Sequence, residues 1–135
     1  MAYWLVKSEP HDWSWQDQLD VDKEPWTGVK NYQAQANMRK MAMGDEVFFY
    51  HSGKDREIVG ICTVATGPYD DPDDPKGKFC LVDLRAKAPL PKPVSLADIK
   101  ADERLRSLAL VRQSRLSVMP IDADSWQLIC AKAGL

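Results

Sequence analysis

Apolar residues in this chain gather in short runs that turn-forming residues separate. Strands are predicted over 2–10, 46–52, 58–66, 79–88 and 114–121. The runs 46–52 and 58–66 are apolar on consecutive residues, which is typical of strands covered on both faces. Turns are predicted at Gly44-Asp45 and at 52–57, an acidic loop over 67–78, and a stiff extended segment over 89–94.

Short helices are predicted between and after these strands. Residues with side chains that accept from the backbone mark their starts. These are Asp12 for a helix over 13–19, Asn31 for a helix to about 42, Ser95 for a helix through Lys100, and Asp122 for a last helix ending near Gly134. Residues 103–110 are predicted to form a further helix.

The order of these elements predicts the fold class. About five strands and four or five short helices are expected, and the strands come in clusters instead of alternating with helices. This favours an α+β fold over a doubly wound parallel sheet. Short, two-sided strands with glycine-bearing turns predict a small, partly closed β-barrel flanked by helices. A length of 135 residues predicts one domain over 1–135.

Composition agrees with this picture and adds a location. Hydrophobic residues make up 44% and charged residues 28%, an ordinary globular composition. Cys62, Cys80 and Cys130 are odd in number and far apart, which suits a reducing compartment. Neither a signal-like segment nor an apolar run of membrane-spanning length is found, so we expect a cytoplasmic protein with no membrane partner.

The formal net charge of −2 argues against strong, non-specific DNA binding. Charge is uneven, however. Residues 104–121 contain four arginines and residues 27–44 contain three cations, and neither segment has a carboxylate. Acid is concentrated in 70–74. Two local basic surfaces on a mildly acidic body permit modest contact with phosphate.

The helix predicted from Asn31 has two aromatic residues beside it that its apolar pattern does not need. Ala34, Met38, Met41 and Ala42 fall on one stripe at helical spacing. Tyr32 points away from that stripe, and Trp26 precedes the helix beside Gly28. We expect both aromatic rings to face a ligand while the methionines anchor the helix behind them.

Several kinds of chemistry are disfavoured by the residues available. The chain has two histidines and no Cys-x-x-Cys pair, so no metal and no cofactor is predicted. His51 and Ser52 are adjacent and would point to opposite faces of a strand, which argues against a hydrolase triad. Glu9 is a possible general base, but it is a lone carboxylate beside a proline.

Polar and aromatic side chains at strand ends and helix starts are the remaining candidates. Such positions commonly line one concavity. An aromatic wall with hydrogen-bonding groups and nearby cations predicts a pocket for a flat polar ring, and its candidate residues are Lys7, Ser8, Glu9, Trp26, Asn31, Tyr32, His51, Ser52, Arg112, Ser114, Arg115 and Ser117.

Six segments, in order, resemble the EVE domain family. They are YWLVKSEP, WTGVKNYQA, GDEVFFYHS, IVGICTV, PVSLADIK and RLSV, and the resemblance runs from about residue 3 to the C-terminus. It implies a PUA-like fold, a small mixed β-barrel flanked by short helices, with kinship to YTH and ASCH domains. It also implies a reader of modified bases, chiefly modified cytosine in DNA, with RNA considered as well.

The resemblance assigns roles to individual residues. Trp26 would be the wall of an aromatic cage, and Lys7, Ser8 and Asn31 would bond the base edge or the backbone near it. Tyr32, Ser52, Arg115 and Ser117 would complete the pocket and its mouth. Lys30, Gln35 and Ala36 depart from the family's Arg, Arg and Asn, which removes a bidentate fork, a cation and an amide.

Phosphate contacts are expected from Lys30, Arg39 and Arg112, and the protein is expected to be a monomer. The predicted function is non-catalytic binding of a modified nucleobase within DNA or RNA. Two alternatives stay open. One is a hydrolase of modified nucleosides that depends on Lys7 or Glu9, and the other is an adaptor that binds a protein partner.

Overall fold

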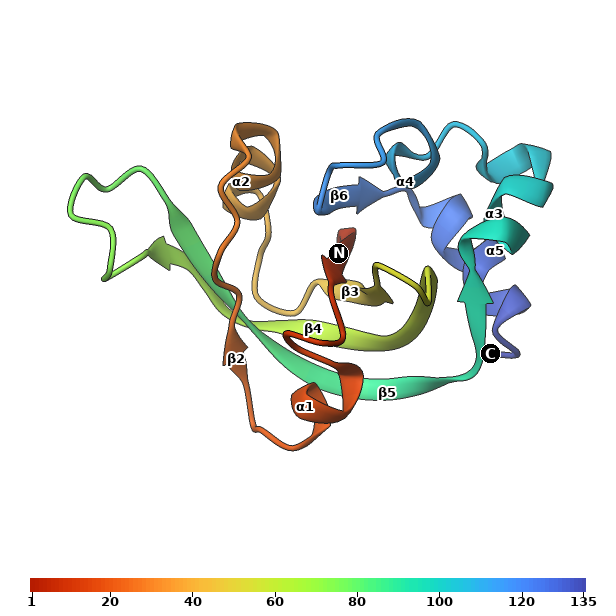
Figure 1. The fold of residues 1–135 in the computed structure, drawn as a ribbon, viewed down its shortest axis with the longest axis horizontal. Helices are drawn as coiled ribbons and strands as arrows, with labels where there is room; N and C mark the ends of the chain where they lie inside the picture. Colours follow the sequence, from red (N-terminus) through yellow and green to blue (C-terminus); the bar gives the residue numbers. More distant parts are fainter.

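A six-stranded mixed sheet organises residues 1–135 in the computed structural model (Figure 1). Its strands are β1 (Tyr3–Ser8), β2 (Glu24–Pro25), β3 (Glu46–His51), β4 (Glu57–Asp70), β5 (Cys80–Ser95) and β6 (Val118–Ile121). The helices are α1 (Trp15–Leu19), α2 (Tyr32–Arg39), α3 (Leu96–Ala101), the 3-10 helix η1 (Glu103–Leu105), α4 (Ala109–Arg112) and α5 (Ala123–Lys132).

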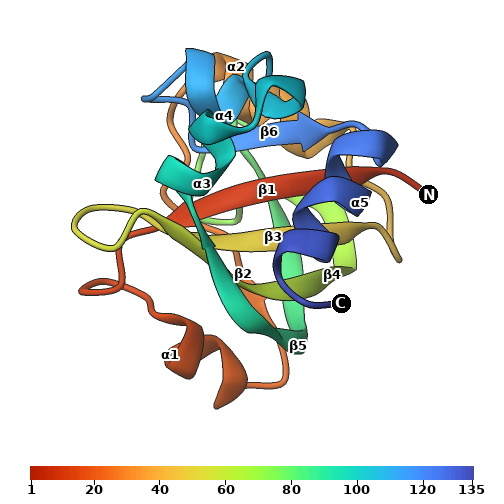
Figure 2. The same cartoon turned by 90° about the vertical axis from the view of Figure 1, so that its right-hand side faces the viewer.

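The sheet is strongly curved but open. Its strands pair in the order β2-β5-β4-β3-β1-β6, and the edge strands β2 and β6 do not pair with each other (Figure 2). The α+β prediction is confirmed. The predicted barrel is not closed, because the two-residue β2 pairs with β5 alone and β6 pairs with β1 alone.

The one parallel pair, β1 with β3, places the ends of two strands side by side. Lys7 lies opposite Tyr50, and Ser8 lies opposite His51. The backbone N–H of Ser52 donates to the carbonyl of Ser8 at 2.9 Å, which continues the pairing past β3. A parallel pair needs a long crossover connection, and here residues 9–45 supply it with α1, β2 and α2.

The two longest strands, β4 and β5, extend beyond the predicted runs. β4 continues to Asp70, into the segment predicted as acidic loop, and β5 continues to Ser95 through the proline-rich segment. Pro89, Pro91 and Pro93 alternate, so the missing N–H groups face one edge of the strand. On the other edge, the N–H of Lys92 donates to the carbonyl of Ala133 at 3.1 Å.

Three predicted helix starts are confirmed. Asn31 accepts from the N–H of Ala34 at 2.9 Å. Ser95 and Asp122 cap α3 and α5 in the same way.

Two helix predictions are wrong. Ser14, and not Asp12, caps α1, because Ser14 and Asp17 satisfy each other's backbone N–H groups in a capping box. The helix predicted over 103–110 is divided into η1 and α4 by a turn at 106–108.

The core is one cluster of 33 buried residues. In β3 the side chains of Val47 to Tyr50 are all buried, as expected for a strand covered on both faces. Ala34, Met38 and Met41 of the predicted apolar stripe are buried as well. Ala42 is exposed, because α2 ends at Arg39 and the helical spacing stops there.

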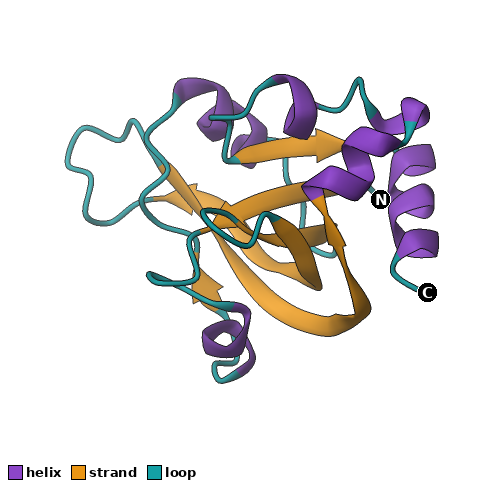
Figure 3. Cartoon of the chain, turned by 45° about the vertical axis from the view of Figure 1, so that its right-hand side comes forward, coloured by secondary structure: helices purple, strands orange, loops and turns teal.

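The helices cover the sheet unevenly. α2 packs against β5 and β6, and α3 and α5 pack near the end of β5 (Figure 3). α1 contacts β5 and stands apart from the other helices. The longest helix, α5, has 10 residues, and none of the helices is long and apolar enough to cross a membrane.

A buried carboxylate, Asp45, ties the start of β3 to the N-terminal strand. It accepts from Trp4 Nε1 at 2.9 Å, from the N–H of Ala42 at 2.9 Å and from the N–H of Ala2 at 3.2 Å. Burial acts to raise the pKa of Asp45, but these hydrogen bonds to the ionised form outweigh it and hold the pKa below its ordinary value.

Asp45→Asn is therefore expected to lower the free energy of unfolding by about 2 kcal/mol at pH 7, because an amide cannot accept at both oxygen positions. A lowered carboxyl pKa contributes stability above the unfolded pKa of about 3.9, and this stability is lost as pH falls through the folded pKa. The difference in urea unfolding between wild type and variant should therefore begin to shrink below about pH 4 and disappear once the pH is below the folded pKa. An equal difference at pH 7 and in acid would contradict the role of the charge.

Candidate functional site

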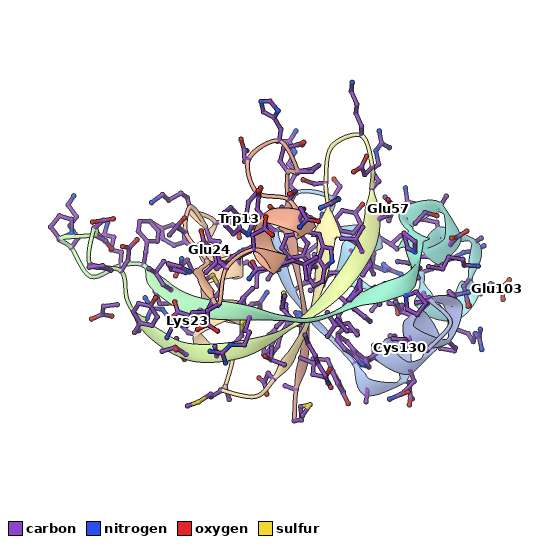
Figure 4. All side chains as sticks on the ribbon, turned by 90° about the horizontal axis from the view of Figure 1, so that it is seen from below. Trp13, Lys23, Glu24, Glu57, Glu103 and Cys130 are labelled. Atoms are coloured by element: carbon purple, nitrogen blue, oxygen red, sulfur yellow. The ribbon has the colours of Figure 1, made fainter.

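A cavity of about 420 Å³ opens where β1 ends and the segment preceding α2 passes over it. We call it the Trp26 pocket. Its lining residues are Lys7, Ser8, Glu9, Asp12, Trp13, Glu24, Pro25, Trp26, Thr27, Gly28, Val29 and Ser117. Figure 4 labels Trp13 and Glu24, which come from the turn after β1 and from β2.

The turn after β1 supplies three of these side chains. The N–H groups of Asp12 and Trp13 both donate to the carbonyl of Glu9 at 2.9 Å, and the Ser8 hydroxyl donates to the carbonyl of Trp13. The carboxylate of Glu9 packs against Gly53, and a Cβ at position 53 would lie only 2.2 Å from Glu9 Oε2. The chain therefore folds back at once, which brings Glu9, Asp12 and Trp13 to one rim.

The indole of Trp13 is held in place by a buried glutamine. Trp13 Nε1 donates to Gln18 Oε1 at 2.9 Å, and Gln18 Nε2 donates to the carbonyl of Leu84 at 2.9 Å. Gln18 is fully buried in α1. Because the indole N–H is already used, Trp13 offers a ligand its ring and not a hydrogen-bond donor.

Trp26 forms the back of the pocket. Its backbone N–H donates to the carbonyl of Val82 at 2.8 Å, and its ring packs edge-on against Phe49 with centroids 5.7 Å apart. The residue is 7% exposed, so most of the ring is packed in the core while the remainder lines the cavity. Its indole Nε1 forms no hydrogen bond within the protein and is available to a ligand.

The loop that carries Trp26 is clamped by Gln35 of α2. Gln35 Nε2 donates to the carbonyl of Val29 at 2.8 Å and to the carbonyl of Cys80 at 3.3 Å, while its Oε1 accepts from the N–H of Cys80 at 2.9 Å. Gln35 is 4% exposed. Gly28 has a φ of 78°, a backbone conformation that favours glycine. Gln35 therefore fixes the loop against β5 instead of facing a ligand.

Acid predominates in the pocket. Glu9, Asp12 and Glu24 line it together with a single cation, Lys7. Burial raises the pKa of Glu24, and the nearby charge of Asp83 raises it further. Such a lining suits a ligand that presents N–H donors and disfavours a phosphate inside the cavity.

Lys7 stands at the border of the pocket. Its Nζ donates to the carbonyl of Ser114 at 2.9 Å and lies 5.7 Å from the centroid of the Tyr50 ring. Burial lowers the pKa of Lys7.

The eight residues that the resemblance assigns to one base-binding pocket are divided among several places. Lys7, Ser8, Trp26 and Ser117 lie together in the Trp26 pocket. Ser52 lines a neighbouring hollow, and Asn31 and Arg115 line a third hollow with Arg112. Tyr32 is 75% exposed on α2 and does not line the Trp26 pocket.

Local structure explains these placements. The Asn31 side chain caps α2, and Ser52 lies beyond the end of β3 on the far side of Lys7. Of the predicted phosphate-contacting residues, Lys30 lies over the Phe79 ring with Nζ 4.5 Å from its centroid. Arg39 donates to the carbonyl of Lys78 at 2.8 Å, so both cations face the acidic loop.

The sequence does not predict Asp12, Trp13 or Glu24 as lining residues of the pocket, nor Gln35 as the support of the loop that carries Trp26. The sequence analysis places Asp12 as the cap and Trp13 as the first residue of a helix that in fact begins at Trp15. The signal available was the Ser14-x-x-Asp17 capping pattern, which excludes both residues from the helix. Glu24 lies in β2, which spans only two residues and is too short to show the alternation of apolar and polar residues that predicts a strand.

The side chain of His51 is engaged within the protein. His51 Nε2 accepts from the N–H of Trp15 at 3.0 Å, which assigns the ring proton to Nδ1, 3.3 Å from Asp55. No group of three or more His, Cys, Asp or Glu side chains is placed to hold a metal ion.

Comparison with known proteins identifies the fold. A protein of Rhodopseudomonas palustris is 48% identical, with a TM-score of 0.95 over 99% of this chain and 94% of that one. Human thymocyte nuclear protein 1, solved in complex with DNA containing 5-methylcytosine, is 25% identical with a TM-score of 0.91 over 100% and 99%. The mouse protein of that name is 31% identical over 94% of this chain and 71% of its own length.

The fold and its pocket define a small PUA-like α+β domain. The model of the EVE domain matches residues 2–132. This chain belongs to the EVE domain family.

Proposed function

We propose that this protein binds a modified cytosine within DNA and holds the base in the Trp26 pocket. The observation that carries the proposal is a cavity of about 420 Å³ in which two indole rings meet three carboxyl side chains. Ligand pockets commonly measure about 300–1,000 Å³. The human relative in complex with 5-methylcytosine-containing DNA supports the choice of ligand.

Stacking supplies the base-independent part of the binding energy. A base stacked on an aromatic side chain gains about 1–3 kcal/mol. Leaving a duplex stack costs a few kcal/mol, and less from a single strand. Trp26 and Trp13 together can offset much of that cost. We therefore expect the base to enter the pocket after leaving its stack, and single strands to bind at least as well as duplexes.

The polar edge of the base is read by carboxylates. Glu and Asp side chains accept from the exocyclic amine at C4 of cytosine. Glu24 is half-buried and lies two residues before Trp26 in the sequence, while Asp12 is exposed at the rim. Glu24 is therefore the better placed to accept from this amine, since its hydrogen bond is less open to water.

Recognition of the methyl group and recognition of the hydrogen-bonding edge can be measured separately by comparing 5-methylcytosine with cytosine and with thymine. 5-Methylcytosine and cytosine differ by one methyl group, which is worth about 0.8 kcal/mol when buried, or roughly fourfold in affinity. 5-Methylcytosine and thymine carry the same methyl group but differ in their hydrogen-bonding edge. A hydrogen bond to a charged group contributes about 1.5–3 kcal/mol. The protein is thus expected to reject thymine more strongly than unmodified cytosine.

The experiment is a binding assay with single-stranded and duplex DNA, and with RNA, carrying cytosine, 5-methylcytosine, 5-hydroxymethylcytosine or thymine at one position. Preference for a modified cytosine supports the proposal, and the polymer that binds best decides between DNA and RNA. Equal affinity for all four bases would refute base reading. Turnover of a nucleoside, or binding confined to a protein partner, would favour the hydrolase or adaptor alternative.

Glu24→Gln is expected to weaken binding of 5-methylcytosine about tenfold, while thymine binding stays the same or improves, because the new amide can donate to the thymine carbonyl. Asp12→Asn is the matched control. It makes the same change of charge at the pocket rim and should have a smaller effect. If both variants lose affinity for both bases equally, Glu24 acts through charge alone and its assigned role is wrong.

A further inference from the structure

A second hollow, of about 300 Å³, lies on the other side of Lys7 from the Trp26 pocket. Its polar lining comes from six residues: Lys7, Tyr50, Ser52, Arg56, Lys100 and Ser114. We call it the cationic hollow.

Charge distinguishes the two cavities. The cationic hollow has three cationic side chains, from Lys7, Arg56 and Lys100, and no carboxylate among its lining residues. None of these cations has a carboxylate within 4.0 Å, whereas five other lysine and arginine side chains form such pairs. The hydroxyl groups of Ser52 and Ser114 add neutral hydrogen-bond donors.

The fold brings these residues together from distant parts of the sequence. The parallel pairing of β1 with β3 sets Lys7 opposite Tyr50. The backbone carbonyl of Arg56 accepts from the N–H of Leu96 at 2.8 Å, which joins the turn before β4 to the helix that carries Lys100. Lys7 Nζ reaches the carbonyl of Ser114 at 2.9 Å. Three cations thus converge from three segments, β1, the turn before β4 and α3, and Ser114 joins them from a fourth.

Arg56 also has an uncommon backbone. Its φ is 47°, in the left-handed region that favours glycine or asparagine, yet the position holds an arginine. Its Nε donates to the carbonyl of Gly53 at 3.2 Å, which leaves its terminal amino groups for an external acceptor.

We propose that the cationic hollow binds a backbone phosphate of the nucleic acid, next to the nucleotide whose base enters the Trp26 pocket. This inference rests on the proposed function for its placement of the strand. Lys7 lines both cavities and links them. The acidic pocket takes the base and the cationic hollow takes the phosphate, so one nucleotide unit spans the border that Lys7 forms. The strand then passes over Arg56 and Lys100, not over Arg112 and Arg115.

The test compares two double variants by titration with a single-stranded oligonucleotide that carries 5-methylcytosine. Arg56→Asn with Lys100→Ala removes two cations of the hollow, and asparagine tolerates the left-handed backbone. Arg112→Ala with Arg115→Ala removes the same charge from the hollow that Asn31 lines. Lys7 is left intact because it belongs to both sites.

The first variant is expected to lose at least tenfold in affinity for the oligonucleotide at about 0.1 M salt. Its slope of log affinity against log salt should become shallower by about 0.7 for each lost phosphate contact on a single strand. Binding of the free nucleoside 5-methyl-2′-deoxycytidine, which has no phosphate, should not change. The second variant should lose less than threefold. The reverse ranking, or equal losses, would overturn the inference.

Further measurements distinguish the phosphate site from the base-reading proposal and from binding of free phosphate or a lipid headgroup. If wild type shows no base preference but the Arg56–Lys100 variant still loses affinity, the base-reading proposal fails and the phosphate site stands. Inorganic phosphate at 10-fold lower concentration than the salt should compete only weakly, since it lacks the base. Vesicles containing phosphatidylglycerol that bind as tightly as the oligonucleotide would contradict a nucleic-acid site.

Discussion

Trp26→Ala is expected to weaken binding of an oligonucleotide carrying a modified cytosine by roughly 5- to 150-fold, the equivalent of the 1–3 kcal/mol that one base gains by stacking. The change removes the back wall of the pocket and the indole N–H that has no partner within the protein. The same substitution is expected to lower the free energy of unfolding by about 3–5 kcal/mol, because Trp26 is 7% exposed and packs against Phe49. Binding isotherms and urea unfolding measure the two effects.

Trp26→Phe separates the two effects. Phenylalanine keeps most of the apolar packing and an aromatic face but has no indole N–H and a smaller ring. We expect a loss of stability below 2 kcal/mol, since the cavity left behind is smaller, together with a binding loss intermediate between wild type and alanine. A folded Trp26→Ala protein that binds with the affinity of wild type would show that the base does not contact this residue.

Gln35→Ala is expected to lower the free energy of unfolding by about 3 kcal/mol or more. It removes the partner of three backbone groups, on Val29 and Cys80, and unpaired buried groups cost about 1–3 kcal/mol each. Because Gln35 clamps the loop that carries Trp26, affinity for the base should also fall. The measurement is urea unfolding combined with hydrogen exchange at the amide of Cys80, which should lose its protection.

Gln33→Ala is the matched control for this prediction. Gln33 lies on the same helix but is exposed, and it makes no side-chain hydrogen bond within the protein. Its substitution should change stability by less than about 0.5 kcal/mol. Similar losses for both variants would mean that the effect comes from the helix as a whole and not from the clamp.

Structural features that depend on residues close together in the chain, such as helix caps and core strands, were predictable from the sequence. The caps Asn31, Ser95 and Asp122 follow from side chains that accept from a backbone N–H three residues on. The core strands follow from runs of apolar residues. Closure of the sheet does not follow, because it depends on whether the edge strands β2 and β6 meet, and neither has a pattern that specifies a partner.

The candidate site was partly predictable for the same reason. Lys7, Ser8, Trp26 and Ser117 lie in one cavity, and strand ends and loops supply all four. Asn31, Ser52 and Arg115 were expected beside them, but the sequence does not say how many concavities the strand ends form. From the sequence, Gln35 shows only the loss of a cation relative to the family, because its partners on Val29 and Cys80 become neighbours only in the folded chain.

The most direct test of base binding is an NMR titration that follows the five tryptophan indole N–H resonances. With 5-methyl-2′-deoxycytidine, we predict saturable shifts for Trp26 and Trp13, and none for Trp4, Trp15 or Trp126, which lie outside the pocket. Thymidine should produce much smaller shifts. Unchanged Trp26 and Trp13 indole resonances at saturating ligand would contradict a base held in the Trp26 pocket.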